Sequence, residues 1–261
     1  MLLAIDIGNT NIHFGLYDRT AGEWCCSWRA RTVHHKMADE YAVLLRNFLQ
    51  EREFSFADVK AVVMASVVPA LTQPFVDLCE RYLKRTPLNI RSGITEAGVR
   101  LLLDQPTAVG ADRVANAAAA KYLYGGPAIV VDFGTSTNFD VLNREGDYLG
   151  GAIAVGIGLA HDALVSRAAQ LYKVELVPPP SAIGRNTVHA MQSGLFLGYV
   201  AMIEGLIARI KAALEAPEAR VIATGGLAPL FREHIPAIDE IAPNLTLDGL
   251  RIIWEINQAQ G

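Results

Sequence analysis

Two short segments of the chain carry a carboxylate, a glycine and small polar side chains in the same order. Residues 6–11 read DIGNTN and residues 132–137 read DFGTST, and each segment directly follows an apolar run. A glycine after a buried strand lets the backbone approach a phosphate, and the exposed N–H groups of such a turn form an anion-binding concavity. The aspartate can hold a hydrated Mg²⁺ that bridges phosphate oxygens. One copy alone is more typical of an ordinary hairpin turn, but two copies favour a phosphate clamp between two lobes.

The second copy also indicates an internal duplication. Aligning Asp6 with Asp132 matches the two glycines and sets Asn9 opposite Thr135. A unit that is repeated once at this separation predicts two similar lobes, whereas a solenoid has a shorter period and more copies. We expect the lobes to cover residues 1–115 and 116–261.

Each lobe is expected to open with three strands and to continue with helices and further strands. In the first lobe the expected strands cover 2–6, 12–18, 25–33, 59–68 and 87–90, and the expected helices cover 38–53 and 75–85. In the second lobe the expected strands cover 128–134, 137–143, 148–155 and 221–226, and the expected helices lie near 159–172, 187–215 and 245–257. Strand triplets followed by helix–strand alternation are typical of the α/β class with mixed β-sheets.

A second group of polar residues lies at 110–113, which read GADR, immediately before a strongly helical run. The carboxylate of Asp112 can accept the proton of an attacking hydroxyl, and the guanidinium of Arg113 can hold an anionic substrate group. Phosphoryl transfer asks the protein for little beyond alignment and charge compensation. The alternative is purely structural, because an aspartate in a first turn favours the helix dipole whatever the function. The sequence leaves both interpretations open.

Two further segments allow a binding role beside a structural one. Residues 224–226 read TGG after an apolar strand, where the backbone can accept an adenosine group or simply form a strand-to-helix turn with positive φ. Residues 183–187 read IGRNT at the start of a long helix, where Asn186 or Thr187 is a natural N-cap.

Several motifs of other nucleotide and metal proteins are missing from the sequence. It contains no G-x-x-x-x-G-K-[ST] loop, no dinucleotide glycine pattern and no protein-kinase motif set. The six histidines have no metal-ligand spacing.

The composition limits the class of protein. Of the 261 residues, 51% are hydrophobic and 19% are charged, which predicts a folded core. The formal net charge of −4 argues against nucleic acid and acidic membranes as partners. Three cysteines without a C-x-x-C pair, and a start without a signal-peptide pattern, favour the cytoplasm.

Eight segments spread over essentially the whole chain, in the same order, resemble type III pantothenate kinases. These segments are IDIGNTN, ASVVP, PTAVGADRVANAAAA, VVDFGTST, GGAIAVGI, IGRNTVHAMQSG, VIATGGLAPL and LTLDGL. The resemblance implies an acetate and sugar kinase/Hsp70/actin-type fold, with duplicated ribonuclease H-like (actin-like ATPase) lobes, in a homodimer with active sites at the subunit interface. It also implies ATP-dependent phosphorylation of the pantothenate hydroxyl to 4′-phosphopantothenate, the first committed step toward coenzyme A.

The resemblance implies a role for individual residues as well. ATP phosphates and Mg²⁺ would be held by Asp6, Ile7, Gly8, Asn9, Thr10, Asn11, Ile12 and His13, with Thr135 in the other lobe. Asp112 would be the general base, and the pantothenate pocket would include Gly110, Ala111, Asp112, Arg113 and, from the partner subunit, Thr187. Asp132 would ligate a monovalent cation, K⁺ or NH₄⁺.

The sequence departs from the family pattern at a few positions. Leu103 stands where the family usually has a tyrosine, three residues before the proline of the P-x-x-V-G-A-D-R segment, which bears on substrate affinity. Ser136, Asn138 and Val155 also differ from the usual residues, and the first two keep their polar character. The alternatives are a kinase of the same fold that acts on another small hydroxylated acid, and a catalytically silent nucleotide-binding protein.

Overall fold

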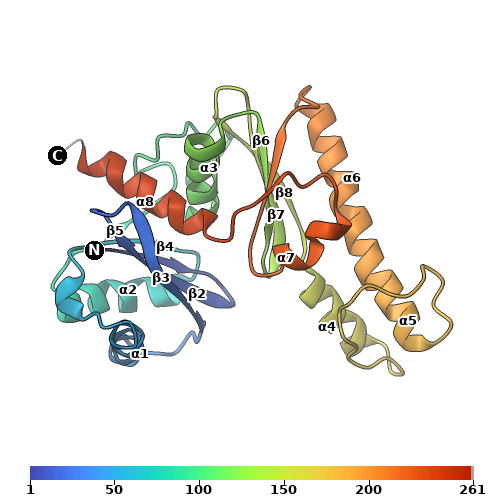
Figure 1. Ribbon diagram of the computed structural model, residues 1–261, viewed down its shortest axis with the longest axis horizontal. Helices are drawn as coiled ribbons and strands as arrows, with labels where there is room; N and C mark the ends of the chain where they lie inside the picture. The colour runs from blue at the N-terminus through green and yellow to red at the C-terminus, as the bar shows by residue number, and fades with distance from the viewer. Residues whose placement is uncertain (260–261) are drawn as a thin grey trace. The chain divides into compact units, whose positions relative to one another are not determined.

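The computed structural model describes residues 1–259, which form two compact units. Unit 1 comprises Met1–Leu123 together with the segment that begins at Asn244, and unit 2 comprises Tyr124–Pro243. Figure 1 shows the elements of both units, which are described separately below.

Unit 1 is built on a five-stranded mixed sheet of order β3-β2-β1-β4-β5. The first three strands are antiparallel, whereas β4 and β5 run parallel to β1. Its elements are β1 (Leu2–Ile7), β2 (Asn11–Asp18), β3 (Glu23–Arg31), α1 (Ala38–Gln50), η1 (Phe56–Asp58), β4 (Ala61–Ser66), α2 (Pro69–Leu78), η2 (Cys79–Leu83), β5 (Leu88–Asn89), η3 (Pro106–Ala108), α3 (Ala111–Tyr124) and α8 (Leu245–Gln258).

The sheet of unit 1 is covered on both faces, because successive side chains of a strand point to opposite sides. On one face, alternate residues of β1 and β2 pack against α1 and α2, with Phe14 and Phe75 fully buried. On the other face, α8 packs against β1, β4 and β2. The central strand β1 is therefore apolar on both sides, while the edge strand β3 alternates between exposed and half-buried residues.

Unit 2 repeats this plan with a five-stranded mixed sheet of order β10-β9-β6-β7-β8. Its core lies between the sheet and the helices α6 and α7, where Phe133, Phe196 and Phe231 are buried. Its elements are β6 (Ala128–Phe133), β7 (Ser136–Leu142), β8 (Tyr148–Val155), α4 (Ile157–Arg167), α5 (Thr187–Gln192), η4 (Ser193–Leu197), α6 (Gly198–Ala213), β9 (Arg220–Thr224), α7 (Ala228–Phe231), η5 (Arg232–His234) and β10 (Glu240–Ile241).

The two sheets confirm the duplication that the repeated motif predicts. Strands β1 to β5 of unit 1 correspond in order and direction to β6, β7, β8, β9 and β10 of unit 2. Asp6 and Asp132 occupy the same place, one residue before the end of the central strand. The strand triplets and most helices lie where the sequence predicts them, although helix α2 starts earlier, at Pro69, and continues into the π-helical turn η2.

The compact units do not divide at 115/116, and the lobe boundary at that position stays a prediction. Helix α3 belongs to unit 1 as far as Leu123, and the last helix, α8, belongs to unit 1 rather than to unit 2. The reason is packing, because α8 lies on the sheet of unit 1. In addition, the indole N–H of Trp24 on β3 donates a hydrogen bond of 2.8 Å to Asp248 on α8.

One continuous helical stretch, Thr187–Ala213, is long and apolar enough to cross a membrane by length and composition alone. Its residues Phe196, Tyr199, Ile203 and Ile207 are buried in the core of unit 2, as in a core helix of a folded domain. The apolar composition is therefore partly explained by core packing.

Close packing between α3 and α8 depends on the absence of a side chain at Gly249. A Cβ atom there would overlap the carbonyl oxygen of Ala115. We expect Gly249→Ala to lower the free energy of unfolding by about 1–3 kcal/mol, because the two helix backbones must move apart. Urea-induced unfolding measures this change. In the control Gly198→Ala, on a helix surface with no atom within 4 Å of the added methyl, we expect a gain of up to about 1 kcal/mol. Equal effects of the two substitutions would contradict the packing argument.

Candidate active site

The first Asp-x-Gly turn joins β1 to β2 and is held tightly by the backbone. Gly8 N–H donates to the carbonyl of Asn11 at 3.1 Å, and the Thr32 hydroxyl donates to the carbonyl of Gly8 at 2.6 Å. Both backbone groups of Gly8 are thus used inside the turn. The neighbouring residues Asn9, Thr10 and Asn11 are exposed at the tip of the turn.

The aspartate of this turn lies in a polar row across the sheet. Asp6 on β1 is paired with His13 on β2, which is paired with Arg29 on β3. Directly paired residues of neighbouring strands share one face of a sheet. Burial, with the charge of Arg29 as a smaller cause, lowers the pKa of His13 to about 4. The imidazole is therefore neutral near pH 7 and can serve as a hydrogen-bonding group there.

Asp112 is the second residue of α3, two residues after Gly110. Its Oδ1 accepts a hydrogen bond of 2.8 Å from the backbone N–H of Arg113. A Cβ atom at Gly110 would overlap this same oxygen, so only glycine leaves room for the carboxylate. Burial raises the pKa of Asp112, against the lowering effects of the Arg113 N–H and guanidinium. A carboxylate with a raised pKa is a stronger base.

The structure brings Asp112 and the first turn to the same edge of the unit 1 sheet. Strands β1 and β4 are parallel neighbours, and Val67, just after β4, donates its N–H to the carbonyl of Ile7 at 3.1 Å. A Cβ at Gly110 would lie 3.3 Å from the side chain of Val67. The start of α3 therefore lies beside the carboxyl ends of β1 and β4, the usual place of a ligand site in an open α/β sheet.

The second Asp-x-Gly turn occupies the equivalent edge of the unit 2 sheet. Gly134 N–H donates to the carbonyl of Ser136 at 3.1 Å, so this turn is one residue shorter than the first. Thr135 is exposed at its tip. Gly156, the N-cap of α4, packs beneath the turn, and a Cβ there would overlap the carbonyl oxygen of Thr135.

Oxygen atoms gather around Asp132 on this edge. Strand β9 runs parallel to β6 and ends opposite it at Thr224, and the next residue, Gly225, has a positive φ of 89°. A Cβ at Gly225 would lie 2.6 Å both from the Asp132 carboxylate and from the carbonyl oxygen of Phe133. The TGG segment thus forms a turn that requires glycine, and it leaves space beside a carboxylate and a backbone carbonyl.

The donor set fits hard cations that are held by few protein ligands. Among residues 1–259, no group of three or more His, Cys, Asp or Glu side chains forms a metal site. A carboxylate together with backbone carbonyls suits K⁺, and one carboxylate together with phosphate oxygens and water suits Mg²⁺. Asp132 fits the first type of site, and Asp6 fits the second.

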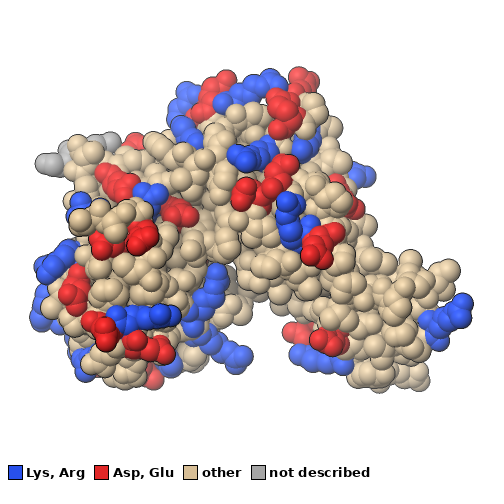
Figure 2. All heavy atoms as spheres, in the orientation of Figure 1, with Lys and Arg blue, Asp and Glu red and all other residues tan. Residues whose placement is uncertain are grey.

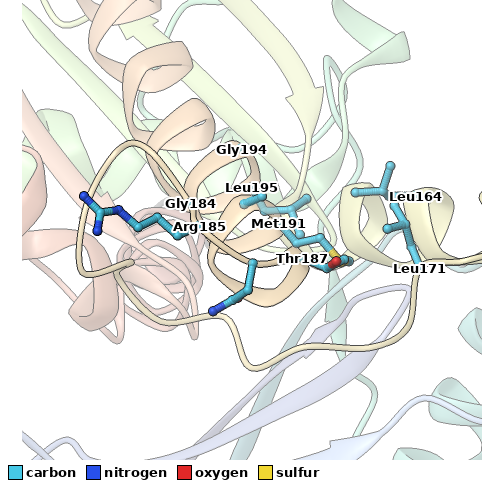
Figure 3. Close-up of a pocket in the computed structure, with 10 residues that line it drawn as sticks. Leu164, Leu171, Gly184, Arg185, Thr187, Met191, Gly194 and Leu195 are labelled. Atoms are coloured by element: carbon cyan, nitrogen blue, oxygen red, sulfur yellow. The ribbon is translucent and has the colours of Figure 1, made fainter.

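Thr187 lies in unit 2, on the wall of an open cavity of about 680 Å³. Figure 3 shows Leu164 and Leu171 on one side of this cavity and Thr187 and Met191 on the other. Asn186 is the N-cap of α5, and its Oδ1 accepts the N–H of His189 at 2.8 Å. Because Asn186 caps the helix, the hydroxyl of Thr187 is not needed for capping.

Two residues of interest are absent from the expected set. Gly156 supports the second turn, and the GGAIAVGI segment that contains it gave no reason to assign it a role. Asn116 is a polar residue inside the alanine-rich helix α3 and is only 1% exposed. Its spacing of four residues from Asp112 was the signal that could have identified it.

The family model and the similar sequences point to the same family. The family model for type III pantothenate kinase matches residues 2–209. The type III pantothenate kinase of Moorella thermoacetica is 48% identical over 257 residues, which cover 98% of this chain and 100% of the relative. That of a Roseiflexus species is 48% identical over 259 residues, which cover 99% of this chain and 100% of the relative.

Solved structures that resemble this one share its fold at low sequence identity. A Campylobacter jejuni protein described as a putative Baf family transcriptional activator has a TM-score of 0.62 at 18% identity, covering 98% of this chain and 99% of that one. A putative 2-dehydro-3-deoxygalactonokinase from Sinorhizobium meliloti has a TM-score of 0.61 at 13% identity, with 98% and 96% covered. A polyphosphate/ATP-glucomannokinase from Arthrobacter has a TM-score of 0.51 at 16% identity, with 99% and 98% covered.

These likenesses confirm the expected α/β fold, with duplicated actin-like lobes and mixed sheets, of the sugar kinase type. Identity over nearly full length, together with the family model, goes beyond the fold. The chain belongs to the type III pantothenate kinase family.

Proposed function

We propose that the protein transfers the γ-phosphoryl group of ATP to the primary hydroxyl of pantothenate, giving 4′-phosphopantothenate in the first step of coenzyme A biosynthesis. Membership of the family supports the substrate and the reaction. The observation that carries the proposal is the position of Asp112, at the start of α3 and beside the carboxyl ends of β1 and β4. This is where a base must lie if phosphates occupy the first turn.

Asp112 acts as the general base. It takes the proton of the pantothenate hydroxyl while the hydroxyl oxygen forms a bond to the γ-phosphorus, and the bond from that phosphorus to the β–γ bridging oxygen breaks to release ADP. The raised pKa that burial gives Asp112 favours proton uptake from the alcohol. Gly110, Ala111 and Arg113 line the pantothenate pocket, where the Arg113 guanidinium pairs with the substrate carboxylate.

Each of the two Asp-x-Gly turns contributes contacts to the ATP phosphates. In the first turn, the exposed residues 9–11 offer backbone and side-chain donors, and neutral His13 lies beside Asp6. Ile7, Gly8 and Ile12 shape the turn through the backbone. Thr135 contributes a hydroxyl from the second turn. Asp6 would hold a hydrated Mg²⁺, which would supply positive charge to the phosphates.

A monovalent cation, K⁺ or NH₄⁺, belongs at Asp132. The space beside Gly225 is bordered by the Asp132 carboxylate and the Phe133 carbonyl, which are oxygen ligands of the kind that K⁺ prefers. When bound, the cation supplies fixed positive charge near the phosphates. Asp132 and the turn at Gly225 keep this oxygen-lined space in place.

The enzyme works as a homodimer in which Thr187 of one subunit reaches pantothenate bound to the other. The cavity next to Thr187 is open, and apolar side chains at it are exposed: Leu164, which lines the cavity, is 38% exposed, and Ile183, next to the lining residue Gly184, is 79% exposed. In the view of Figure 2, the surface over α4 and α5 carries few charges. An exposed apolar surface of this kind is typical of a subunit interface. It also accounts for the remaining apolar residues of Thr187–Ala213 in a cytoplasmic enzyme with neither membrane nor nucleic acid as a partner.

The first test replaces the base. We expect Asp112→Asn to lower kcat for pantothenate phosphorylation by about 10²–10⁴-fold, because an amide cannot accept the hydroxyl proton. A coupled ADP-release assay measures the rate. Thermal unfolding serves as the control, and the variant should be at least as stable as the wild type, because the carboxylate pKa is already raised by burial. Turnover close to that of the wild type would refute the role of Asp112.

A second test changes the monovalent ion. At constant ionic strength and with saturating Mg²⁺, we expect phosphorylation with K⁺ or NH₄⁺ and little with Na⁺, because the larger ions fit the oxygen-lined space at Asp132. Asp132→Asn should remove the difference between K⁺ and Na⁺. Equal rates of the wild type in both ions would contradict a specific site.

A third test asks whether Thr187 acts across a dimer. Asp112→Asn and Thr187→Ala, each nearly inactive alone, are unfolded together and refolded as a mixture. Half of the dimers are then mixed, and each mixed dimer holds one intact site, so activity should recover to about a quarter of the wild-type value. If Thr187 acts within its own subunit, mixing restores nothing. Refolding of each variant by itself is the control.

A further inference from the structure

Asn116 presents a buried hydrogen-bond donor that the fold does not use. The residue lies in the second turn of α3 and is 1% exposed. Its Oδ1 accepts a hydrogen bond of 2.8 Å from the hydroxyl of Thr246 on α8. Its Nδ2 has no hydrogen-bond partner among residues 1–259. A buried, unpaired amide costs roughly 1–3 kcal/mol, so its presence calls for a function or a bound group.

The position of Asn116 relative to Asp112 points to that function. The two residues are four apart on one helix, and side chains at this spacing lie above one another on the same face. Long side chains of a helix lean toward its N-terminus, which for Asn116 is the direction of Asp112. Thr246 occupies the oxygen end of the amide, so the NH₂ end is directed elsewhere. The Oδ1 of Asp112 accepts the Arg113 N–H, which leaves Oδ2 to accept another donor.

We propose that Asn116 is a positioning residue for phosphoryl transfer, and that its Nδ2 group donates a hydrogen bond to the Asp112 carboxylate when substrate is bound. The inference rests on the proposed function of Asp112 as the base. The hydrogen bond fixes one carboxylate oxygen and leaves the other aimed at the acceptor hydroxyl. Geometry of this kind matters because a base must lie within hydrogen-bond reach of the proton that it takes.

The effect of the proposed hydrogen bond on the pKa of Asp112 depends on the other groups that already shift that pKa. Arg113, on the same helix, is the charged side chain that acts on the pKa of Asp112. Asp248 lies on α8, the helix that packs closely against α3 at Gly249, and it is not among the groups that shift the pKa of Asp112. A donor to the ionised carboxylate lowers its pKa, so the loss of this donor raises it.

The test is the pH profile of Asn116→Leu, which keeps the approximate volume and removes the donor. We expect kcat to fall about tenfold to a hundredfold, the usual effect of losing a hydrogen bond to a charged group, while KM for ATP stays unchanged. The acidic limb of the kcat profile should move up by about one pH unit, because the Asp112 carboxyl now keeps its proton to higher pH.

Thr246→Val is the matched control. It breaks the same contact between α3 and α8 but leaves the Nδ2 donor in place, so it should lower stability without moving the acidic limb. A merely structural role predicts the opposite result, with equal kinetic effects of both variants or an unmoved acidic limb in Asn116→Leu, and either outcome overturns the proposal. If the wild type itself fails to phosphorylate pantothenate, the proposed function fails instead.

A measurement on the wild type covers the case in which Asn116→Leu does not fold. With pantothenate and a non-hydrolysable ATP analogue bound, the side-chain ¹⁵N–H₂ resonances of Asn116 should shift with the same pKa as Asp112. In Asp112→Asn the same resonances should be flat over that pH range. If the chemical shifts of the Asn116 side chain in the wild type do not change as Asp112 titrates, the proposal is overturned.

Discussion

The site depends on the parallel pairing of the central strand of each sheet with its neighbour, β1 with β4 and β6 with β9. Because β1 runs parallel to β4 in register, the end of β1 at Ile7 lies beside Ser66 and Val67. The same pairing of β6 with β9 sets Asp132 opposite Thr224. A shift of one residue would turn each aspartate to the other face of its sheet. Such a shift is opposed because it would turn the aspartate into the apolar core that lies between each sheet and its helices.

Glycine then decides how closely the parts of the site approach one another. At Gly110 the missing side chain leaves room for the Asp112 carboxylate, and at Gly225 it leaves room beside Asp132. At Gly249 it lets α8 lie directly on the helix that carries the base. These three positions differ in backbone conformation, since only Gly225 has a positive φ, so space rather than flexibility explains Gly110 and Gly249.

The sequence predicts the parts of the molecule that repeat or alternate. The paired DxG segments predicted the duplicated sheets, and the apolar runs predicted the strands. The sequence could not predict that α8 belongs to unit 1, because the pattern of an amphipathic helix does not indicate which of two sheets the helix packs against. Asn116 was missed for a similar reason. An asparagine in an alanine-rich helix is as typical of an exposed position as of a buried one, and it is the burial of Asn116 and its hydrogen bond with Thr246 that distinguish the two.

Asp112 and Asn116 each lower the stability of the fold, so their presence is not explained by folding alone. Burial raises the pKa of Asp112, so the ionised carboxylate destabilises the fold at pH values above that raised pKa, and this penalty is lost as pH falls and the group is protonated. The unpaired Nδ2 of Asn116 adds a second penalty one helical turn away. A hydrogen bond between the two groups in the substrate complex would reduce both penalties at once, so substrate binding is favoured by the same arrangement that makes the free enzyme less stable.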